Sequence, residues 1–513
     1  MATHPFKDRP GWKMLIGGEL VPGGGAALEV MNPATGEVLG EAPAASETDV
    51  SNAVAAAREA YTTWRWTAPE KRGEMLFEIA RRIREHHDEL VDLETWENGK
   101  PRIQSVRDVT NAERTFRFYA GASDKFYGQS VYDSPTEMRK IVYEPYGVVA
   151  VIIPWNWPPM HTADFTALAL ATGNTVVLKP APETPLSSLR IAELAADVLP
   201  PGVLNVVTGG VDTGVQLVAH PGIDFIAFTG SDKTGEKILA AAATRILPTM
   251  MELGGKNASI LFPDADIDKA VQGMVRSAFF NSGQACSGSE RVLVHETIYK
   301  TFMERFTSAV AGLVVGEGFD ERSIVGPMVS RRQQEKVQGA LERATAAGAC
   351  IPVRSDLPRD ERLEGGFWVP PTVITEAAPD AEIMHRHRQR RRLRSHQRRL
   401  DPRPGRRPPH GHPHRGRRGG GEPRQHRRAG SPLRRLQAQR RRAQEGLPGG
   451  DAQLQPGQGD PDGPLRLSGA TDGAGSASVR PRDDAGAGPD GHHGAGASTR
   501  RPSPVAASAW RAS

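Results

Sequence analysis

A thiol and a carboxylate are the side chains of this chain best suited to covalent catalysis. Cys286 is one of 2 cysteines in 513 residues, and it follows an Asn-Ser-Gly-Gln break between a helical pattern and the β-like run 291–294. A thiol at such a turn can face a cleft, and backbone amides directed at it favour the nucleophilic thiolate. Glu252, which precedes a Leu-Gly-Gly-Lys turn, could activate a water molecule in a later step. The alternative is that Cys286 is a small buried residue and Glu252 a surface acid at a strand end.

Further polar residues follow the ends of predicted strands, where α/β proteins bind ligands. Asn156 lies in a Pro-Trp-Asn-Trp-Pro motif, and its amide could donate to an oxyanion. Lys179 ends the next strand and could bond ribose hydroxyls or an adenosine phosphate. Gly230 and Ser231 precede a helix whose free amides could bind a pyrophosphate, and glycines such as Gly210 would let the backbone approach a ligand. Each residue also has a plain structural interpretation, as a packing residue, a solvated charge or a turn.

The elements that must hold these residues are typical of an α/β protein. Short β-branched runs alternate with helical segments from residue 147 onward, which predicts a doubly wound, Rossmann-like parallel sheet. The predicted strands are 148–153, 175–178, 203–207 and 224–228, with helices that begin near residues 187, 213 and 234. No Gly-x-Gly-x-x-Gly follows the first strand, so the usual dinucleotide fingerprint is missing.

The region before this sheet combines short strands, helices and a hairpin. Turn residues separate predicted strands at 16–21 and 30–38, and apolar residues recur at helical spacing over 54–64 and 76–90. The segment 130–144 predicts a β-hairpin that turns at Asp-Ser-Pro and is exposed enough to pair with another element.

The chain changes character at about residue 385. Before it, a second α/β segment runs from 258 to about 384, with one helical face formed by Tyr299, Phe302, Phe306 and Val310. From residue 385 onward there are 28 arginines and 10 acidic residues, a net charge of +18 against +5 for the whole chain. Residues 1–384 therefore carry a net charge of −13, which argues against a polyanion-binding body and against nucleic acid as a partner.

Two interpretations of the segment 385–513 remain. It could be a disordered, RNA-binding tail, although Trp510 is its one aromatic residue able to stack on bases. The segment also lacks Lys, Ile, Phe, Tyr, Asn and Met, whose codons are rich in A and T. We favour the second interpretation, a GC-rich gene read out of frame.

The composition bears on the location of the protein and on metal binding. The first 14 residues contain no apolar run of the kind found in secretory signals, and the longest apolar runs are far too short to span a bilayer. With only 2 cysteines, a reducing cytoplasm is the expected location. Most histidines lie in the C-terminal segment without ligand spacing in the body, so we expect no metal site.

Six motifs, taken together and in this order, resemble the aldehyde dehydrogenase superfamily from about residue 16 to about residue 384. They are Asn32-Pro33-Ala34-Thr35-Gly36, Pro154-Trp155-Asn156-Trp157-Pro158, Gly173-Asn174-Thr175-Val176-Val177-Leu178-Lys179-Pro180, Phe228-Thr229-Gly230-Ser231, Glu252-Leu253-Gly254-Gly255-Lys256 and Gly283-Gln284-Ala285-Cys286.

The resemblance implies an NAD(P)-dependent oxidation of an aldehyde to a carboxylic acid. By analogy, Cys286 attacks the carbonyl, the Asn156 side chain and the Cys286 amide hold the oxyanion, and Glu252 activates the water that hydrolyses the thioester. Residues 1–122 and 146–253 would form the cofactor-binding domain, 123–145 an oligomerisation hairpin and 254–384 a catalytic domain that lacks its last part. The implied cofactor contacts are Ile152, Pro154, Trp155, Lys179, Glu183, Gly210, Gly214, Gly230, Ser231 and Leu253.

The chain departs from the family pattern at several positions. Pro182 occupies the place of a ribose-binding glutamate, with Glu183 one residue later, so NAD is only slightly favoured over NADP. Phe165 replaces a lysine that supports the proton relay of the glutamate. The family's continuation after residue 384, through Glu-Ile-Phe-Gly-Pro to the strands of a homodimer or homotetramer interface, is absent. A coenzyme A-acylating enzyme and an inactive frameshifted relic are the alternative interpretations. The apolar side chains near Trp157, Met160 and Phe280 permit aliphatic or aromatic aldehydes and do not identify the substrate.

Resequencing the gene across the codons for residues 383–389 tests the frameshift. We expect a correction of one or two bases to restore a continuation similar to Glu-Ile-Phe-Gly-Pro. An unchanged reading would leave the sites above as remnants in a chain that cannot complete its fold, and activity would have to be shown directly.

Overall fold

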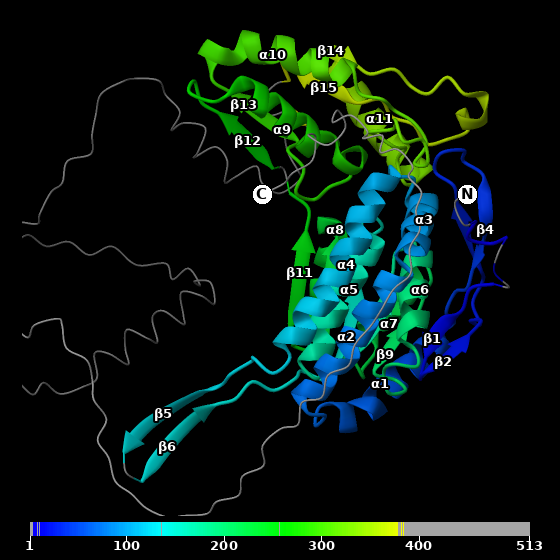
Figure 1. Ribbon diagram of the computed structural model, residues 1–513, viewed down its shortest axis with the longest axis vertical. Coiled ribbons are helices and arrows are strands. Elements are labelled where there is room, and N and C mark those ends of the chain that lie inside the picture. The colour runs from blue at the N-terminus through cyan, green and yellow to red at the C-terminus, as the bar shows by residue number, and fades with distance from the viewer. Residues whose placement is uncertain are drawn as a thin grey trace, which may run out of the picture. The chain divides into compact units, whose positions relative to one another are not determined.

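The computed structural model describes residues 4–377 except 8, 10, 135 and 256, together with 381 and 383 (Figure 1). The predictions made for 385–513 lie outside these residues.

The fold is organised around a seven-stranded sheet with the strand order β11-β10-β7-β8-β9-β1-β2. The five strands from β11 to β9 pair in parallel, whereas β1 pairs antiparallel with both β9 and β2. The strands are β1 (Met14–Ile16), β2 (Glu19–Val21), β7 (Val148–Ile152), β8 (Thr175–Lys179), β9 (Leu204–Val206), β10 (Phe225–Gly230) and β11 (Thr249–Leu253). The predicted doubly wound sheet is therefore confirmed.

The order of the strands creates a switch point between β7 and β10. The chain proceeds from β7 through β8 to β9 in one direction, and then returns to place β10 on the other side of β7. Loops that leave the carboxyl ends of β7 and β10 consequently diverge, and ligands of such sheets bind in the crevice between them. The strand β7 is buried along almost its whole length, which explains its unbroken run of apolar residues.

Helices connect and cover these strands. Those between the strands are α5 (Pro158–Ala171), α6 (Leu186–Ala195), α7 (Val211–Ala219) and α8 (Asp232–Ala243), and the last three begin close to their predicted starts. The N-terminal helices are α1 (Glu47–Trp64), α2 (Pro69–Glu85), α3 (His87–Asn98) and α4 (Arg102–Ala122). The predicted segment 76–90 is divided between α2 and α3 at His86, whose backbone leaves helical geometry. Among the described residues, no helix has the length and apolar character needed to cross a membrane.

Two antiparallel hairpins lie outside the main sheet. The strands β3 (Leu28–Met31) and β4 (Val38–Ala42) form one hairpin, and β5 (Gln129–Ser134) and β6 (Glu137–Ile141) form the predicted hairpin. Every residue of β6 is exposed, including Met138 at 61% and Ile141 at 51%. Apolar side chains this exposed in a hairpin mark a surface that another chain could cover.

The second α/β segment has a smaller core than the first. Its elements are β12 (Ala258–Leu261), α9 (Ile267–Phe279), η1 (Phe280–Gly283), β13 (Arg291–Val294), α10 (Glu296–Ala311), α11 (Arg331–Ala346), β14 (Cys350–Arg354), η2 (Glu361–Leu363) and β15 (Thr372–Thr375). Phe302, Phe306 and Val310 of α10 are buried in this core as predicted. Tyr299 was wrongly placed with them, since it is 44% exposed.

One face of the short β12–β13 sheet is open to solvent. Ile260, Phe262 and Leu293 are 53%, 55% and 40% exposed, which is unusual for neighbouring large apolar residues. Apolar side chains exposed in this way mark a surface that another element or chain could cover.

The helix α4 offers a test of the core, because Phe116 is fully buried while Phe118, two residues later, is 67% exposed. We expect Phe116→Ala to lower the free energy of unfolding by about 3–5 kcal/mol, because it leaves a cavity between packed helices. The matched Phe118→Ala should cost less than about 0.5 kcal/mol. Urea unfolding followed by circular dichroism measures both, and equal losses would contradict this placement of α4.

Candidate active site

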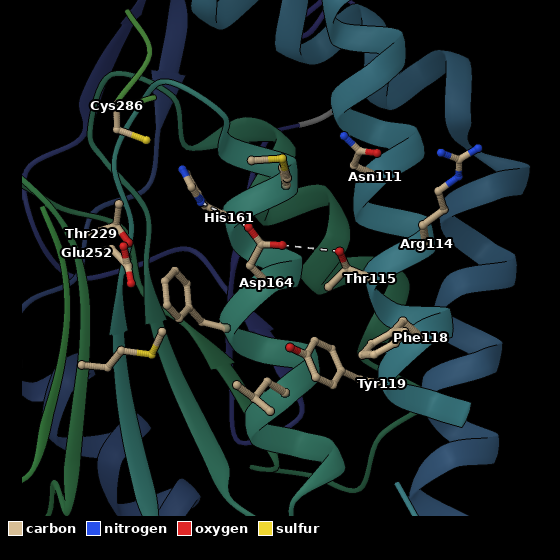
Figure 2. A pocket seen from close by; sticks show the side chains of 14 residues that line it. Asn111, Arg114, Thr115, Phe118, Tyr119, His161, Asp164, Thr229, Glu252 and Cys286 are labelled. Atoms are coloured by element: carbon tan, nitrogen blue, oxygen red, sulfur yellow. Dashed lines mark hydrogen bonds and ion pairs between the residues drawn. The ribbon is translucent and has the colours of Figure 1, made fainter. Parts of the chain in front are cut away.

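Cys286 and Glu252 line the same cleft, which has a volume of about 660 Å³ (Figure 2). Glu252 belongs to β11, and Cys286 follows η1 in the second α/β segment. Thr229 of β10 also lines the cleft and pairs in register with Glu252. Both Cys286 and Glu252 are exposed, so a small molecule can reach the thiol and the carboxylate. The fold therefore brings together the two residues that the sequence singled out for catalysis.

The turn before Cys286 has a strained but well-anchored backbone. Asn281 and Ser282 have φ values of 49° and 59°, in the left-handed region that non-glycine residues seldom occupy. The Asn281 amide donates to Oε1 of Gln104 over 2.8 Å, and the Ser282 hydroxyl donates to the main-chain oxygen of Gly326 over 2.8 Å. These bonds compensate for the strain and determine where the following cysteine lies.

Asn156 is tied to the same turn. Its side chain is buried, and Nδ2 donates to the main-chain oxygen of Gln284 over 3.0 Å, two residues before Cys286. A carboxamide nitrogen carries two N–H groups, so one remains to donate elsewhere. The side-chain oxygen Oδ1 is buried and has no hydrogen-bond partner among the described residues. The structure thus places Asn156 beside the cysteine turn, although it is not among the residues that line the cleft in Figure 2.

The predicted cofactor contacts gather at the carboxyl edge of the parallel sheet. Ile152 pairs with Lys179 at the ends of β7 and β8, and Gly230 pairs with Leu253 at the ends of β10 and β11. The remaining members follow the same strand ends or begin the next helices, namely Pro154, Trp155, Glu183, Gly210, Gly214 and Ser231. Residues separated by about a hundred positions are therefore neighbours along one sheet edge.

Lys179 is the buried cation of this edge. Its side chain is 5% exposed, and Nζ donates to the main-chain oxygen of Pro180 over 3.1 Å. Burial lowers the pKa of Lys179 to about 8, and the negative charge of Glu183 opposes this shift. A partly desolvated ammonium group is well suited to bind ribose hydroxyls or a phosphate.

Two helix N-termini, those of α7 and α8, border this edge. α7 begins after Gly210 without a side-chain cap, and a Cβ atom at Gly210 would meet no atom within 4 Å. α8 begins after Ser231, whose hydroxyl accepts the Thr234 amide over 3.3 Å. Unpaired amides at a helix N-terminus, with open space beside the backbone, favour a phosphate-bearing ligand. The residues present therefore fit a dinucleotide.

The lining of the cleft differs from the apolar pocket expected at Trp157, Met160 and Phe280. Met160 does line the cleft, but the other two are not among its lining residues. Polar side chains from α4 and α5 join it, namely Asn111, Arg114, Thr115, His161 and Asp164. These residues could not be predicted from the sequence, because helical spacing indicates which face of α4 is buried but not which element lies against it.

Comparison with known proteins agrees with this geometry. The aldehyde dehydrogenase family matches residues 21–387. Aldehyde dehydrogenase citD of Monascus ruber is 38% identical over 358 residues, which cover 70% of this chain and 71% of the relative. The putative aldehyde dehydrogenase DhaS of Bacillus subtilis is 38% identical over 377 residues, 72% of this chain and 75% of its own.

Solved structures give the same result. An NAD+ complex of an aldehyde dehydrogenase from Bacillus cereus superposes with a TM-score of 0.71 at 37% identity, over 73% of this chain and 77% of that chain. Betaine aldehyde dehydrogenase from Staphylococcus aureus, solved with NAD+, gives a TM-score of 0.71 at 34% identity, over 73% and 75% of the two chains. The chain belongs to the aldehyde dehydrogenase family.

The lowered pKa of Lys179 predicts a pH-dependent stability. The folded pKa of about 8 lies below the ordinary value of 10.5, so between these values the unfolded chain binds a proton that the folded chain does not. Stability should therefore rise with pH in this window. We expect the free energy of unfolding of the wild type, relative to Lys179→Met, to increase by about 2 kcal/mol from pH 7.5 to pH 10. Urea unfolding at the two pH values measures it, and a constant difference would show that Lys179 has an unshifted pKa.

Proposed function

We propose that this chain oxidises an aldehyde to a free carboxylic acid with NAD(P)+, and that Cys286 is its nucleophile. One observation carries the proposal: the Cys286 thiol and the Glu252 carboxylate line one cleft next to the carboxyl edge of the sheet. Family membership and the relatives solved with NAD+ support the same reaction.

Acylation begins when the Cys286 thiolate attacks the carbonyl carbon of the aldehyde. The carbonyl oxygen then becomes an alkoxide that needs hydrogen-bond donors. The second N–H of Asn156 and the main-chain amide of Cys286 supply them, because the bond from Asn156 to Gln284 keeps the carboxamide beside the turn. A donor of this kind stabilises the transition state by about 2.7–4 kcal/mol.

The residues that would hold the dinucleotide lie at or near the carboxyl edge of the sheet. Lys179 would bond its ribose or phosphate groups, and the N-terminus of α8 at Ser231 would hold its pyrophosphate. When bound, NAD(P)+ accepts the hydride that the aldehyde carbon must lose. Glu183 places a negative charge near Lys179, which opposes a 2′-phosphate and favours NAD over NADP.

Deacylation is assigned to Glu252. Its exposed carboxylate can remove a proton from a water molecule, which attacks the thioester and releases Cys286 as a thiolate. Phe165 lines the cleft and contributes no charge there, so Glu252 must act without the lysine that the family resemblance implies. Release of a free acid is favoured over transfer to coenzyme A because this carboxylate is present.

The same proposal gives each part of the chain a role. Residues 1–122 and 146–253 bind the cofactor, and 254–384 carry the nucleophile. The hairpin 123–145 joins subunits of a homodimer or homotetramer, since the exposed apolar residues of β5 and β6 suit such a contact. A cytoplasmic location is proposed from the scarcity of cysteines.

Two substitutions separate the proposed roles. Cys286→Ser should reduce kcat by at least about 10⁴-fold, since a hydroxyl without a base is a poor nucleophile. Glu252→Gln should reduce kcat by about 10²–10⁴-fold and leave the thioester on the enzyme. The measurements are NAD+-dependent oxidation of propanal without coenzyme A, and mass spectrometry of the intact full-length chain after mixing.

Cys350→Ser is the matched control, because Cys350 is also exposed but donates from its thiol to Glu376 over 3.1 Å, in a strand of the second segment. It should leave kcat unchanged. Turnover that requires coenzyme A and gives acyl-coenzyme A instead of the free acid would contradict the hydrolytic assignment, and a Glu252→Gln variant without an acyl adduct would remove the role given to Glu252.

A further inference from the structure

The side chain of Lys100 is fully enclosed by protein. Its ammonium group has no exposure to solvent and lies at the link between α3 and α4. Nζ donates to Oε1 of Glu94 over 2.7 Å, to Oδ2 of Asp108 over 2.7 Å and to the main-chain oxygen of Asn156 over 2.8 Å. An ammonium group has three N–H donors, so these bonds use all of them.

The cluster keeps Lys100 charged. Burial alone would lower the pKa of Lys100, but the neighbouring carboxylates of Asp108 and Glu94 raise it above its ordinary range. Burial raises the pKa of Glu94 well above its usual value, and the positive charge of Lys100 opposes this shift. A buried ion pair of this kind contributes little to stability compared with apolar packing. Stability alone therefore does not account for the third hydrogen bond of Lys100, which goes to the main-chain oxygen of Asn156.

The third bond leads directly to the candidate active site. The main-chain oxygen of Asn156 accepts from Lys100 and also from Nδ2 of Asn281, over 2.9 Å. Asn281 belongs to the left-handed turn that precedes Cys286, and the Asn156 side chain donates back to Gln284 in the same turn. Two fully buried donors therefore hold one peptide oxygen of Asn156. Rotation of that peptide would move the Asn156 carboxamide away from the turn.

We propose that Lys100 is a positioning residue, which holds the backbone of Asn156 so that its side-chain amide is directed at the oxyanion formed on Cys286. The proposal rests on the oxyanion role given to Asn156 above. Lys100 itself does not touch the substrate, and nothing in the reaction requires it to lose a proton. Its effect on rate must therefore pass through the Asn156 side chain.

A purely structural role makes a different prediction. If Lys100 only stabilised the α3–α4 link, its loss would lower stability and slow every variant by the same factor. If it acts through Asn156, its loss should have no further effect on rate once the Asn156 side chain has been removed. A double-mutant cycle distinguishes the two cases.

The test reaction is the acylation of Cys286 by p-nitrophenyl acetate in the full-length chain. The thiolate attacks the ester carbonyl, and the tetrahedral oxyanion then collapses. The p-nitrophenolate leaves, and the acetyl group stays bound to the sulfur of Cys286. No dinucleotide or hydride transfer is required, so the burst of p-nitrophenolate reports on oxyanion stabilisation alone. Cys286→Ser, which should abolish the burst, verifies that the burst comes from this thiol.

The substitutions are made in an Asp108→Asn background, so that loss of the ammonium leaves no unpaired carboxylate of Asp108 in the core. Asp108→Asn alone is the matched control, because it alters the cluster and keeps the bond from Lys100 to Asn156. Thermal unfolding of every variant gives its folded fraction. We expect the control to acylate at nearly the wild-type rate.

Against this control, Asn156→Ala should slow the burst by about 10²–10³-fold, and Lys100→Met by on the order of 10²-fold. Adding Lys100→Met to Asn156→Ala should change the rate by less than about twofold. The inference would be overturned if the rate losses of the two single variants multiplied in the double variant, or if Lys100→Met left the rate unchanged. A wild-type chain with a normal burst but no aldehyde oxidation would overturn the proposed function and leave the inference about Lys100 standing.

Discussion

The register of the parallel strands around β7 is the constraint on which the rest of the structure depends. Because β7 pairs with β8 on one side and β10 on the other, the carboxyl ends of β7, β8 and β10 align, and β11 extends the same edge. Most residues proposed to contact the dinucleotide end or follow these strands, Gly210 and Gly214 lie at the start of the helix after β9, and Glu252 belongs to β11 itself. A shift of one residue in β11 would turn Glu252 away from the cleft, since successive side chains of a strand point to opposite faces.

The nucleophile comes from outside this sheet, so its placement needs separate contacts. Hydrogen bonds between Asn281, Gln284 and Asn156 join the cysteine turn to the loop after β7. The bond between Asn281 and Gln104 extends this connection to α4, and Lys100 extends it through Asn156. Buried polar groups that require defined geometry thus link the cysteine turn to the first segment, in addition to apolar contacts between the two segments such as that of Trp96 with Phe319.

The sequence predicted those parts of the molecule that depend on local pattern. Apolar runs and turns located the parallel strands, and the position of Cys286 after a turn indicated an accessible thiol that the structure places at a cleft. Local sequence pattern did not predict the tertiary contacts. Tyr299 has the spacing of its buried neighbours on α10, yet its side chain is left exposed. The bond from Lys100 to Asn156 could not be predicted from local pattern, because the two residues lie 56 positions apart.

The open face of β12 and β13 has a consequence for the behaviour of this chain in solution. These strands form a two-stranded sheet among the described residues, so each has a backbone edge with unpaired hydrogen-bonding groups. Together with the exposed side chains of Ile260, Phe262 and Leu293, such edges can pair with any extended strand of matching apolar pattern. Self-association through this sheet would increase with protein concentration and would compete with folding. The folded fraction would then depend on kinetics during synthesis as well as on the free energy of the folded state.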